Sequence, residues 1–136
     1  MGTEPYEIDV QIRPEDVDGM GHVNNIVYVR WVQEVALAHW AAAAPADAQA
    51  AMTWVVLRHE IDYLRPARPG DAVRARTWIG AGESLRYERF TEIVRGDGTV
   101  LARGRTLWCP VDITTGRPKR VPPEVRAAFA RDEQDG

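Results

Sequence analysis

The sequence predicts a single α+β domain in which a five-stranded antiparallel sheet packs against one long α-helix, with a short helix at the C-terminus. Three observations carry this prediction: a strand-like segment at the start, one long apolar helical segment, and four further strand-like segments after it. An antiparallel sheet with one open face can bury such a helix. With 136 residues and 45% hydrophobic content, we expect residues 1–136 to form one domain with its own core.

The first two elements differ in their hydrophobic period. Apolar and polar residues alternate through residues 6–13, YEIDVQIR, which is the period of a half-buried strand, and Pro14 ends it. After a loop, residues 24–44 begin with asparagines that can cap a helix and then continue for about five turns. Only one stripe of this helix is polar, formed by Arg30, Gln33 and Glu34. We therefore expect the sheet to wrap around it.

Four more strands are predicted in the second half of the chain. After Pro45 and a linker of small residues, residues 53–64 are rich in β-branched and aromatic side chains. The other strand-like segments are residues 71–80, 84–95 and 99–113. The last two are joined through Asp97-Gly98, which indicates a hairpin because a type I′ turn needs positive φ at both central residues. The tail at 122–136, PPEVRAAFARDEQDG, is typical of a short helix that frays.

Charge and cysteine content narrow the function classes. A net charge of -3 with 27% charged residues fits neither a disordered chain nor a basic nucleic-acid binder. Cys109 is the only cysteine, so no intramolecular disulfide can form, and no Cys/His spacing makes a zinc site. The N-terminus lacks the apolar core of a signal peptide, and no apolar run approaches the roughly 18 to 20 residues of a membrane span. We expect a cytoplasmic protein that acts without nucleic acid or membrane.

Polar residues and glycines are concentrated in residues 15–24, EDVDGMGHVN, directly before the long helix. Backbone N–H groups at a helix N-terminus lack intrahelical acceptors and the helix dipole is positive there, so this end can stabilise an oxyanion. Gly19 and Gly21 permit tight backbone geometry and close approach of a ligand. Asp16 and Asp18 should point in different directions, so we expect one acid to be available for chemistry and the other to brace the loop.

Residues 16–31, DVDGMGHVNNIVYVRW, resemble the D-x-D-x-x-G-H-V-N-N-x-x-Y motif of hotdog-fold thioesterases of the 4-hydroxybenzoyl-CoA thioesterase and acyl-CoA thioesterase type. Residues 58–71, RHEIDYLRPARPGD, are similar to the second strand and following turn of that family, and the similarity continues to about residue 113. The resemblance implies a hotdog fold, in which five antiparallel strands wrap a central helix. It also implies a homodimer or homotetramer with active sites at subunit interfaces, where a pantetheine arm threads between chains.

The resemblance assigns catalytic roles residue by residue. Asp18 matches the family's catalytic carboxylate, which attacks the thioester carbonyl or activates a water to do so. The backbone amide of Asn25 matches the position whose N–H polarises the thioester carbonyl. His22 and Asn24 belong to the motif and would orient water, the carboxylate or the loop, with a structural hydrogen bond and a plain helix cap as their alternatives.

The resemblance also names the residues expected at the substrate. They are Gly21, Tyr28, Ser84 and Arg86, with packing as the alternative for Tyr28. Some family members carry basic residues just before the serine that starts the fourth strand, where they meet CoA phosphates. This chain has GAGES there, with Glu83 before Ser84. Arg86 and Arg89 are the nearby candidates for CoA recognition, and because they lie on alternate sides of a strand we expect at most one of them to face the ligand. The alternative is CoA held by arginines of another subunit.

The remaining titratable and aromatic residues have simpler interpretations. We expect His39 and His59 to be ordinary packing or surface histidines, and Cys109 to be a buried, inert thiol. Glu60 and Asp62 share one strand face, which we expect to be solvated rather than a paired-carboxylate site. The tryptophans are interpreted as core and interface anchors rather than a substrate platform.

The sequence therefore predicts an enzyme: a homo-oligomeric acyl-CoA thioesterase that needs no metal or redox cofactor, with coenzyme A only as part of the substrate. One alternative is a thioesterase for acyl carrier protein thioesters, which would explain the weak phosphate-binding pattern. Another is a non-catalytic module that binds acyl thioesters, because fold does not fix function. The position of the acid before the helix favours a thioesterase over a hotdog dehydratase or hydratase.

Overall fold

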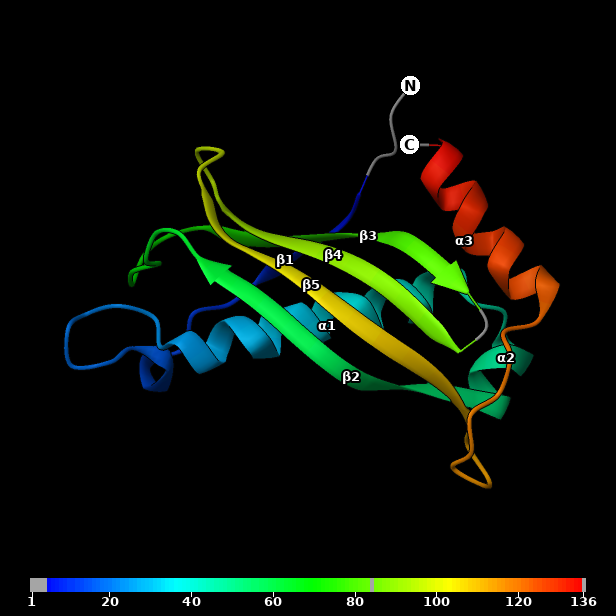
Figure 1. The fold of residues 1–136 in the computed structure, drawn as a ribbon. Coiled ribbons are helices and arrows are strands. Elements are labelled where there is room, and N and C mark those ends of the chain that lie inside the picture. Colours follow the sequence, from blue (N-terminus) through cyan, green and yellow to red (C-terminus); the bar gives the residue numbers. More distant parts are fainter. Residues whose placement is uncertain (1–4, 84, 136) are drawn as a thin grey trace.

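A five-stranded antiparallel sheet curves around one long helix in the computed structural model, which describes residues 5–83 and 85–135 (Figure 1). The strands are β1 (Tyr6–Val10), β2 (Met52–Tyr63), β3 (Val73–Glu83), β4 (Arg86–Arg95) and β5 (Val100–Asp112). The α-helices are α1 (Asn25–Ala43), α2 (Ala46–Ala51) and α3 (Pro123–Asp135). The strand order is β1-β3-β4-β5-β2, and every pairing is antiparallel. The predicted hotdog arrangement is confirmed.

Helix α1 lies across one face of the sheet and supplies the centre of the core. Trp31 and Val35 have no exposed surface, and they pack with Leu101 of β5 and Ile93 of β4. Burial of each such side chain stabilises the fold by about 1.5–3 kcal/mol.

Of the predicted polar stripe, Gln33 is exposed and Arg30 and Glu34 are half-buried. The apolar Ile26 and Leu37 are also exposed, so the sheet covers only part of the apolar circumference of α1.

Two local predictions were wrong. The first strand ends at Val10 rather than residue 13, and Pro14 begins a 3-10 turn, Pro14–Asp16. The segment expected to be a linker folds as α2, with Pro45 at its N-cap. Four of the six residues of α2 are alanine, the best helix former, so the helix signal was present in the composition of that segment.

The β4–β5 hairpin is confirmed, but its turn differs from the predicted one. Gly98 N donates to Arg95 O (2.8 Å) and Arg95 N donates to Thr99 O (2.8 Å), so three residues form the loop. Gly98 has φ of 94°, as in the three-residue hairpins that end in a left-handed glycine. Asp97 stabilises this loop by accepting a hydrogen bond from Thr99 N (3.0 Å).

Strand β2 forms one edge of the sheet and runs the length of the molecule. It starts beside α2 at Met52 and ends at Tyr63, whose hydroxyl donates to the carbonyl oxygen of Asn25 at the start of α1 (3.3 Å). Its outer edge has no strand partner in the chain that the structure describes, and Val55 and Leu57 are exposed there. Edges of this kind are available for pairing with another chain.

The core has two parts, one towards each end of α1. The larger part lies between the first half of α1 and strands β1, β3, β4 and β5. The smaller part gathers Met52 and Val125 with the half-buried Trp40, Trp54 and Phe129, under α3. Among the described residues, no helix has both the length and the apolar character needed to cross a membrane.

Candidate active site

The loop before α1 is a closed turn in front of the helix N-terminus. Val17 and Val23 form an antiparallel bridge, and between them the backbone turns back on itself. Asp18 N donates to His22 O (2.8 Å), and Gly21 N donates to Asp18 O (3.0 Å). Gly21 has φ of 76°, a left-handed conformation that favours glycine. The loop therefore has a fixed shape that depends on this glycine.

Asp16 braces this loop from inside, as the sequence predicts. Its side chain is 3% exposed and accepts two hydrogen bonds from the Arg30 guanidinium (2.8 and 3.0 Å) and one from Arg13 N (2.9 Å). The hydrogen bonds from Arg30 hold the pKa of Asp16 below its usual value. The Asp16 carbonyl oxygen also accepts from Asn24 N (2.8 Å), so Asp16 joins the loop to the residue that caps α1.

Asp18 points the other way, to the surface. Its Oδ1 accepts hydrogen bonds from Met20 N (2.9 Å) and His22 N (3.1 Å), and its side chain is exposed. Among the described residues, Oδ2 of Asp18 has no hydrogen-bond partner. One carboxylate oxygen thus fixes the side chain on the loop, and the other is free to meet a water or a substrate.

The N-terminus of α1 is capped by the loop that carries Asp18. Asn24 has extended backbone geometry, and its Oδ1 accepts from Ile26 N (3.3 Å). The Asn24 side chain is therefore a helix cap, one of its two predicted roles. Asn25 is the first residue of α1 and is exposed, so its N–H has no acceptor within the helix. This amide is a donor that a carbonyl oxygen outside the chain can reach.

The other two motif residues in this region contribute mainly to structure. His22 is half-buried, and its backbone N–H and carbonyl both bond to Asp18. Tyr28 is 2% exposed, and its hydroxyl accepts a hydrogen bond from Ala67 N (2.9 Å). Burial raises the pKa of Tyr28. The ring and the hydroxyl of Tyr28 are both used inside the protein, which favours packing, its predicted alternative, over a contact with substrate.

The expected CoA-contacting residues lie elsewhere in the fold. Arg86 is exposed at the start of β4, next to the β3–β4 connection. In Figure 1 this connection lies at one end of the molecule, and the Asp18 loop, which precedes the N-terminus of α1, lies at the other. Ser84 lies outside the described residues. Arg89 is 7% exposed on the inner face of β4, where its Nη1 contacts His39 Nδ1 (3.0 Å) and Thr77 Oγ1 (3.1 Å). A single chain does not bring Arg86 and Asp18 together.

The residues interpreted as structural occupy structural positions. His39 is buried and stacks on Tyr6, with ring centroids 4.9 Å apart. His59 Nδ1 lies 3.0 Å from Thr106 Oγ1, and burial lowers the pKa of this histidine. Cys109 is a buried thiol. In the described part of the chain, no three His, Cys, Asp or Glu side chains are placed to hold a metal ion.

The predicted solvated face of β2 carries ion pairs. Glu60, which is about half exposed, pairs with Arg58 (2.7 Å) and with Arg105 (3.5 Å). Asp62 on the same face is exposed. The two acids therefore do not form an isolated carboxylate pair, because cations already neutralise Glu60.

Sequence reasoning missed a cavity at the far end of α1. It has a volume of about 160 Å³ and is lined by residues of α1, α3 and strands β2 to β5. Three of the five tryptophans, Trp40, Trp54 and Trp108, line it and also pack in the core, as expected of them. These residues come from three separate elements, so no local motif connects them. The only signal of the cavity in the sequence was the number of tryptophans.

A profile of the thioesterase-like superfamily matches residues 12–129. No curated protein matches the chain in sequence. Among solved structures, a thioesterase from Thermus thermophilus, complexed with coenzyme A and Zn, is 25% identical, with a TM-score of 0.84 over 98% of this chain and 96% of that one.

Two structures from Staphylococcus aureus share the fold at lower identity. A hypothetical protein described in complex with CoA is 17% identical, with a TM-score of 0.86 over 98% of this chain and 87% of that one. A DHNA-CoA thioesterase is 21% identical, with a TM-score of 0.79 over 96% and 91%. These two similarities agree with the fold.

Proposed function

Because the chain belongs to the thioesterase-like superfamily, we propose that it hydrolyses an acyl-CoA thioester to the free acid and CoA, with Asp18 as the catalytic carboxylate. The observation that carries this proposal is the placement of Asp18. It is exposed on a glycine-containing turn in front of the N-terminus of α1, with one oxygen fixed by two backbone amides and the other without a partner among the described residues.

The helix N-terminus supplies the second part of the chemistry. In the proposed reaction the thioester carbonyl oxygen accepts a hydrogen bond from Asn25 N–H, and the positive end of the helix dipole stabilises the negative charge that develops on that oxygen. Loss of one such donor typically lowers kcat by about 10²–10³. Because the donor belongs to the backbone, we expect substitution of the Asn25 side chain to matter less than disruption of the turn.

Asp18 can act in two ways that give the same products. As a nucleophile, its oxygen bonds to the thioester carbon, the C–S bond breaks, the CoA thiolate takes up a proton, and water then hydrolyses the mixed anhydride. As a general base, Asp18 takes a proton from a water as that water attacks the same carbon, and the thiolate again leaves and is protonated. The free Oδ2 and the surface position of Asp18 are compatible with both routes.

We propose that two copies of the chain pair along the free edge of β2. The edge is long and carries the exposed side chains of Val55 and Leu57. Pairing would cover these residues and extend the sheet. Light scattering at micromolar concentration tests this proposal, and a monomer mass would contradict it.

The choice of CoA over acyl carrier protein rests on the similar structures described with coenzyme A. The carrier-protein thioesterase and the non-catalytic binding module remain the competing functions. A carrier-protein enzyme would release thiol from acylated carrier protein far faster than from acyl-CoA. A binding module would bind both without releasing thiol.

Thiol release from short, long and aromatic acyl-CoAs tests the proposal directly. We expect turnover by the native protein and a loss of about 10²-fold or more in Asp18→Asn, which keeps the oxygen that accepts from Met20 and His22 but removes the charge. Asp9→Asn, on the exposed side of β1, is the matched control and should retain native activity. Equal activity in Asp18→Asn and the native protein would refute the assignment of Asp18.

A further inference from the structure

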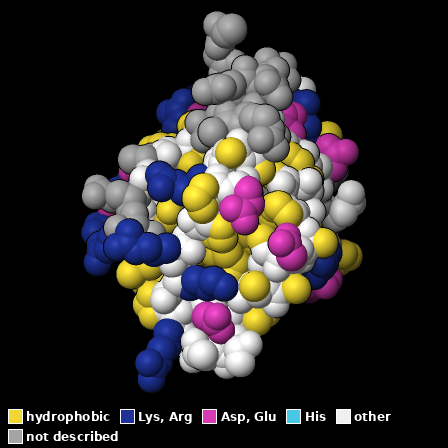
Figure 2. Space-filling model, turned by 90° about the vertical axis from the view of Figure 1, so that its right-hand side faces the viewer, with side chains coloured by type: hydrophobic (Ala, Val, Ile, Leu, Met, Phe, Trp, Pro, Cys, Tyr) yellow, Lys and Arg dark blue, Asp and Glu magenta, His cyan; other side chains and the backbone are white. Residues whose placement is uncertain are grey.

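The cavity under α3 has the construction of a binding site for an apolar group. Its volume is about 160 Å³, and apolar side chains make up most of its wall. Figure 2 shows apolar side chains gathered in the middle of this end of the molecule, with Lys, Arg, Asp and Glu side chains around them. Sites for small molecules are typically apolar hollows of this kind with a few polar groups at the margin.

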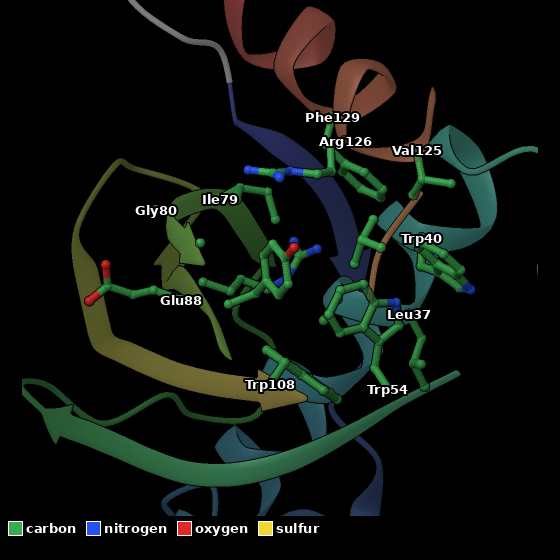
Figure 3. A pocket seen from close by; sticks show the side chains of 15 residues that line it. Leu37, Trp40, Trp54, Ile79, Gly80, Glu88, Trp108, Val125, Arg126 and Phe129 are labelled. Atoms are coloured by element: carbon green, nitrogen blue, oxygen red, sulfur yellow. The ribbon is translucent and has the colours of Figure 1, made fainter. Parts of the chain in front are cut away.

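Aromatic rings dominate the wall. Trp40 meets Trp54 edge to face (5.6 Å between centroids) and stacks on Phe129 of α3 (5.8 Å). Trp54 in turn meets Tyr87 of β4 edge to face (5.4 Å). In Figure 3 the side chains of Trp40, Trp54, Trp108 and Phe129 surround a common space. Rings held in this way offer both faces and edges to a further ring.

Gly82 of β3 makes room for this arrangement. A Cβ at Gly82 would lie 2.3 Å from Cδ2 of Tyr87. Any side chain at Gly82 would therefore push the Tyr87 ring from its place. The missing side chain at this position helps to set the shape of the cavity.

Three charged residues line the cavity, and protein partners hold two of them, Glu88 and Arg89, whereas the third, Arg126 of α3, is exposed. The carboxylate of Glu88 forms an ion pair with Arg105 on the outer face of the sheet, and Figure 3 shows it turned away from the aromatic side chains. The guanidinium of Arg89 is held by His39 and Thr77. The space itself is therefore bounded mainly by apolar surface.

The volume of the cavity suits a small ligand. A protein cavity of about 150 Å³ lined by Leu, Ile and Phe is large enough to bind benzene. A cavity of about 160 Å³ therefore fits one aromatic ring. Phe129 and Val125 of α3 belong to the wall, where Phe129 stacks on Trp40 of α1, so α3 restricts the space open to a longer acyl chain.

In the proposed dimer this cavity would lie next to the Asp18 loop of the other copy. Strand β2 begins at the cavity, where Trp54 forms part of the wall. It ends at Tyr63, whose hydroxyl donates a hydrogen bond to the carbonyl oxygen of Asn25. Two β2 strands that pair antiparallel run in opposite directions. The Asn25 end of β2 in one copy therefore lies beside the Trp54 end of β2 in its partner. One chain can then hold the thioester carbonyl while the other holds the acyl group.

We propose that this cavity is the acyl pocket of the enzyme and that it selects a compact acyl group bearing a single aromatic ring over long straight chains. The inference rests on the proposed function, because it assigns the cavity to the same thioester substrate. Ala36, Trp40 and Phe129 are then specificity-determining residues.

Binding of uncleavable ketone analogues tests the pocket without relying on catalysis. Phenacyl-CoA carries a ring beyond its carbonyl, and 2-oxododecyl-CoA carries a straight chain in the same place; both are thioethers that cannot be hydrolysed. Tryptophan fluorescence should report their binding, because three tryptophans line the cavity. We expect the native protein to bind phenacyl-CoA at least tenfold more tightly than 2-oxododecyl-CoA.

Two pocket variants should shift this preference in opposite directions. Ala36→Leu places three more carbon atoms at a position that lines the cavity and should weaken phenacyl-CoA binding about tenfold or more. Phe129→Ala removes part of the far wall and should improve 2-oxododecyl-CoA binding. The matched control is Phe90→Ala, on the outer face of β4 against Trp78, which should leave both affinities unchanged.

The outcomes separate this inference from the proposed function. Equal affinity of the native protein for the two analogues, or equal effects of Ala36→Leu and Phe90→Ala, would overturn the assignment of the pocket. If Ala36→Leu fails to fold by circular dichroism, Phe129→Ala decides alone, and an unchanged analogue ratio in that variant overturns the inference. Selective binding of phenacyl-CoA without hydrolysis of any thioester would sustain the pocket and refute the thioesterase.

Discussion

Replacement of Asp16 by asparagine should loosen the turn that presents Asp18. In the native protein the Asp16 carboxylate accepts three hydrogen bonds of 2.8–3.0 Å, two of them from the Arg30 guanidinium. Asparagine keeps one acceptor oxygen but turns an NH₂ group towards a donor. Because Asp16 is 3% exposed, water cannot replace the lost contacts.

The size of the effect follows from these contacts. A hydrogen bond to a charged group contributes about 1.5–3 kcal/mol, and removing one partner of a buried pair costs about 3–5 kcal/mol. Arg30 is 31% exposed and can recover some hydration, so we expect a loss of about 2–4 kcal/mol. For a domain of this length that corresponds to a fall in Tm of about 10 °C.

The effect should depend on pH in a defined direction. The pKa of Asp16 is lowered in the folded protein from its ordinary value of 3.8, chiefly by hydrogen bonds from Arg30. A lowered pKa stabilises the fold above the unfolded value, and this contribution is lost as pH falls through the folded value. The difference in Tm between native and Asp16→Asn should therefore be full at pH 7 and shrink below about pH 4.

Thermal unfolding followed by circular dichroism, at one protomer concentration, measures this difference. Asp9→Asn, at an exposed site, is the control for loss of one negative charge. An Asp16→Asn protein as stable as Asp9→Asn at pH 7 would refute the view that the ion pair braces the loop. If the stability difference stays the same down to pH 3, the charge of Asp16 is not its cause, although Asp16 could still brace the loop through its hydrogen bonds.

Two further predictions concern packing. Tyr28→Phe leaves the Ala67 amide without its hydroxyl acceptor, so the free energy of unfolding, measured in urea, should fall by about 1–3 kcal/mol; a change below about 0.3 kcal/mol would contradict this. Gly82→Ala would bring a Cβ to within 2.3 Å of the Tyr87 ring. This substitution should lower the free energy of unfolding by about 1–3 kcal/mol and alter the near-ultraviolet circular dichroism of the Trp54–Tyr87 pair. An unchanged spectrum would contradict the prediction.

The fold and the loop could be predicted because their signals are local. The two-residue period of β1, the apolar circumference of α1 and the turn residues Asp97-Gly98 each depend on neighbours along the chain. The opposite directions of Asp16 and Asp18 also followed from their spacing. Where local signals competed, as between small-residue linker and alanine-rich helix in α2, the prediction failed.

The cavity could not be predicted because it depends on tertiary packing. Trp40, Trp54, Trp108 and Phe129 come from four elements spread over most of the chain, and only the antiparallel sheet and the position of α3 bring them together. Tyr28 was ambiguous for the same reason, since its hydroxyl partner, Ala67, is distant in sequence.

The separation of Asp18 from the cavity makes a strong prediction about shared active sites. Helix α1 has 19 residues and is therefore about 28 Å long, and the two features lie at its opposite ends. If each site combines Asp18 of one copy with the cavity of its partner, Asp18→Asn and Ala36→Leu should each be impaired towards an aromatic acyl-CoA. A mixed dimer of the two variants contains one site with both changes and one site with neither.

Mixing the two variants under conditions that exchange subunits should therefore restore activity. With random exchange, half of the dimers are mixed and each has one intact site, so about a quarter of native activity should return. Asp18→Asn mixed with Asp16→Asn is the comparison, because both changes affect the same end of the chain. If both residues acted within one chain, every site in the mixture would contain a defect, and activity that stays at the level of the separate variants would refute the shared site.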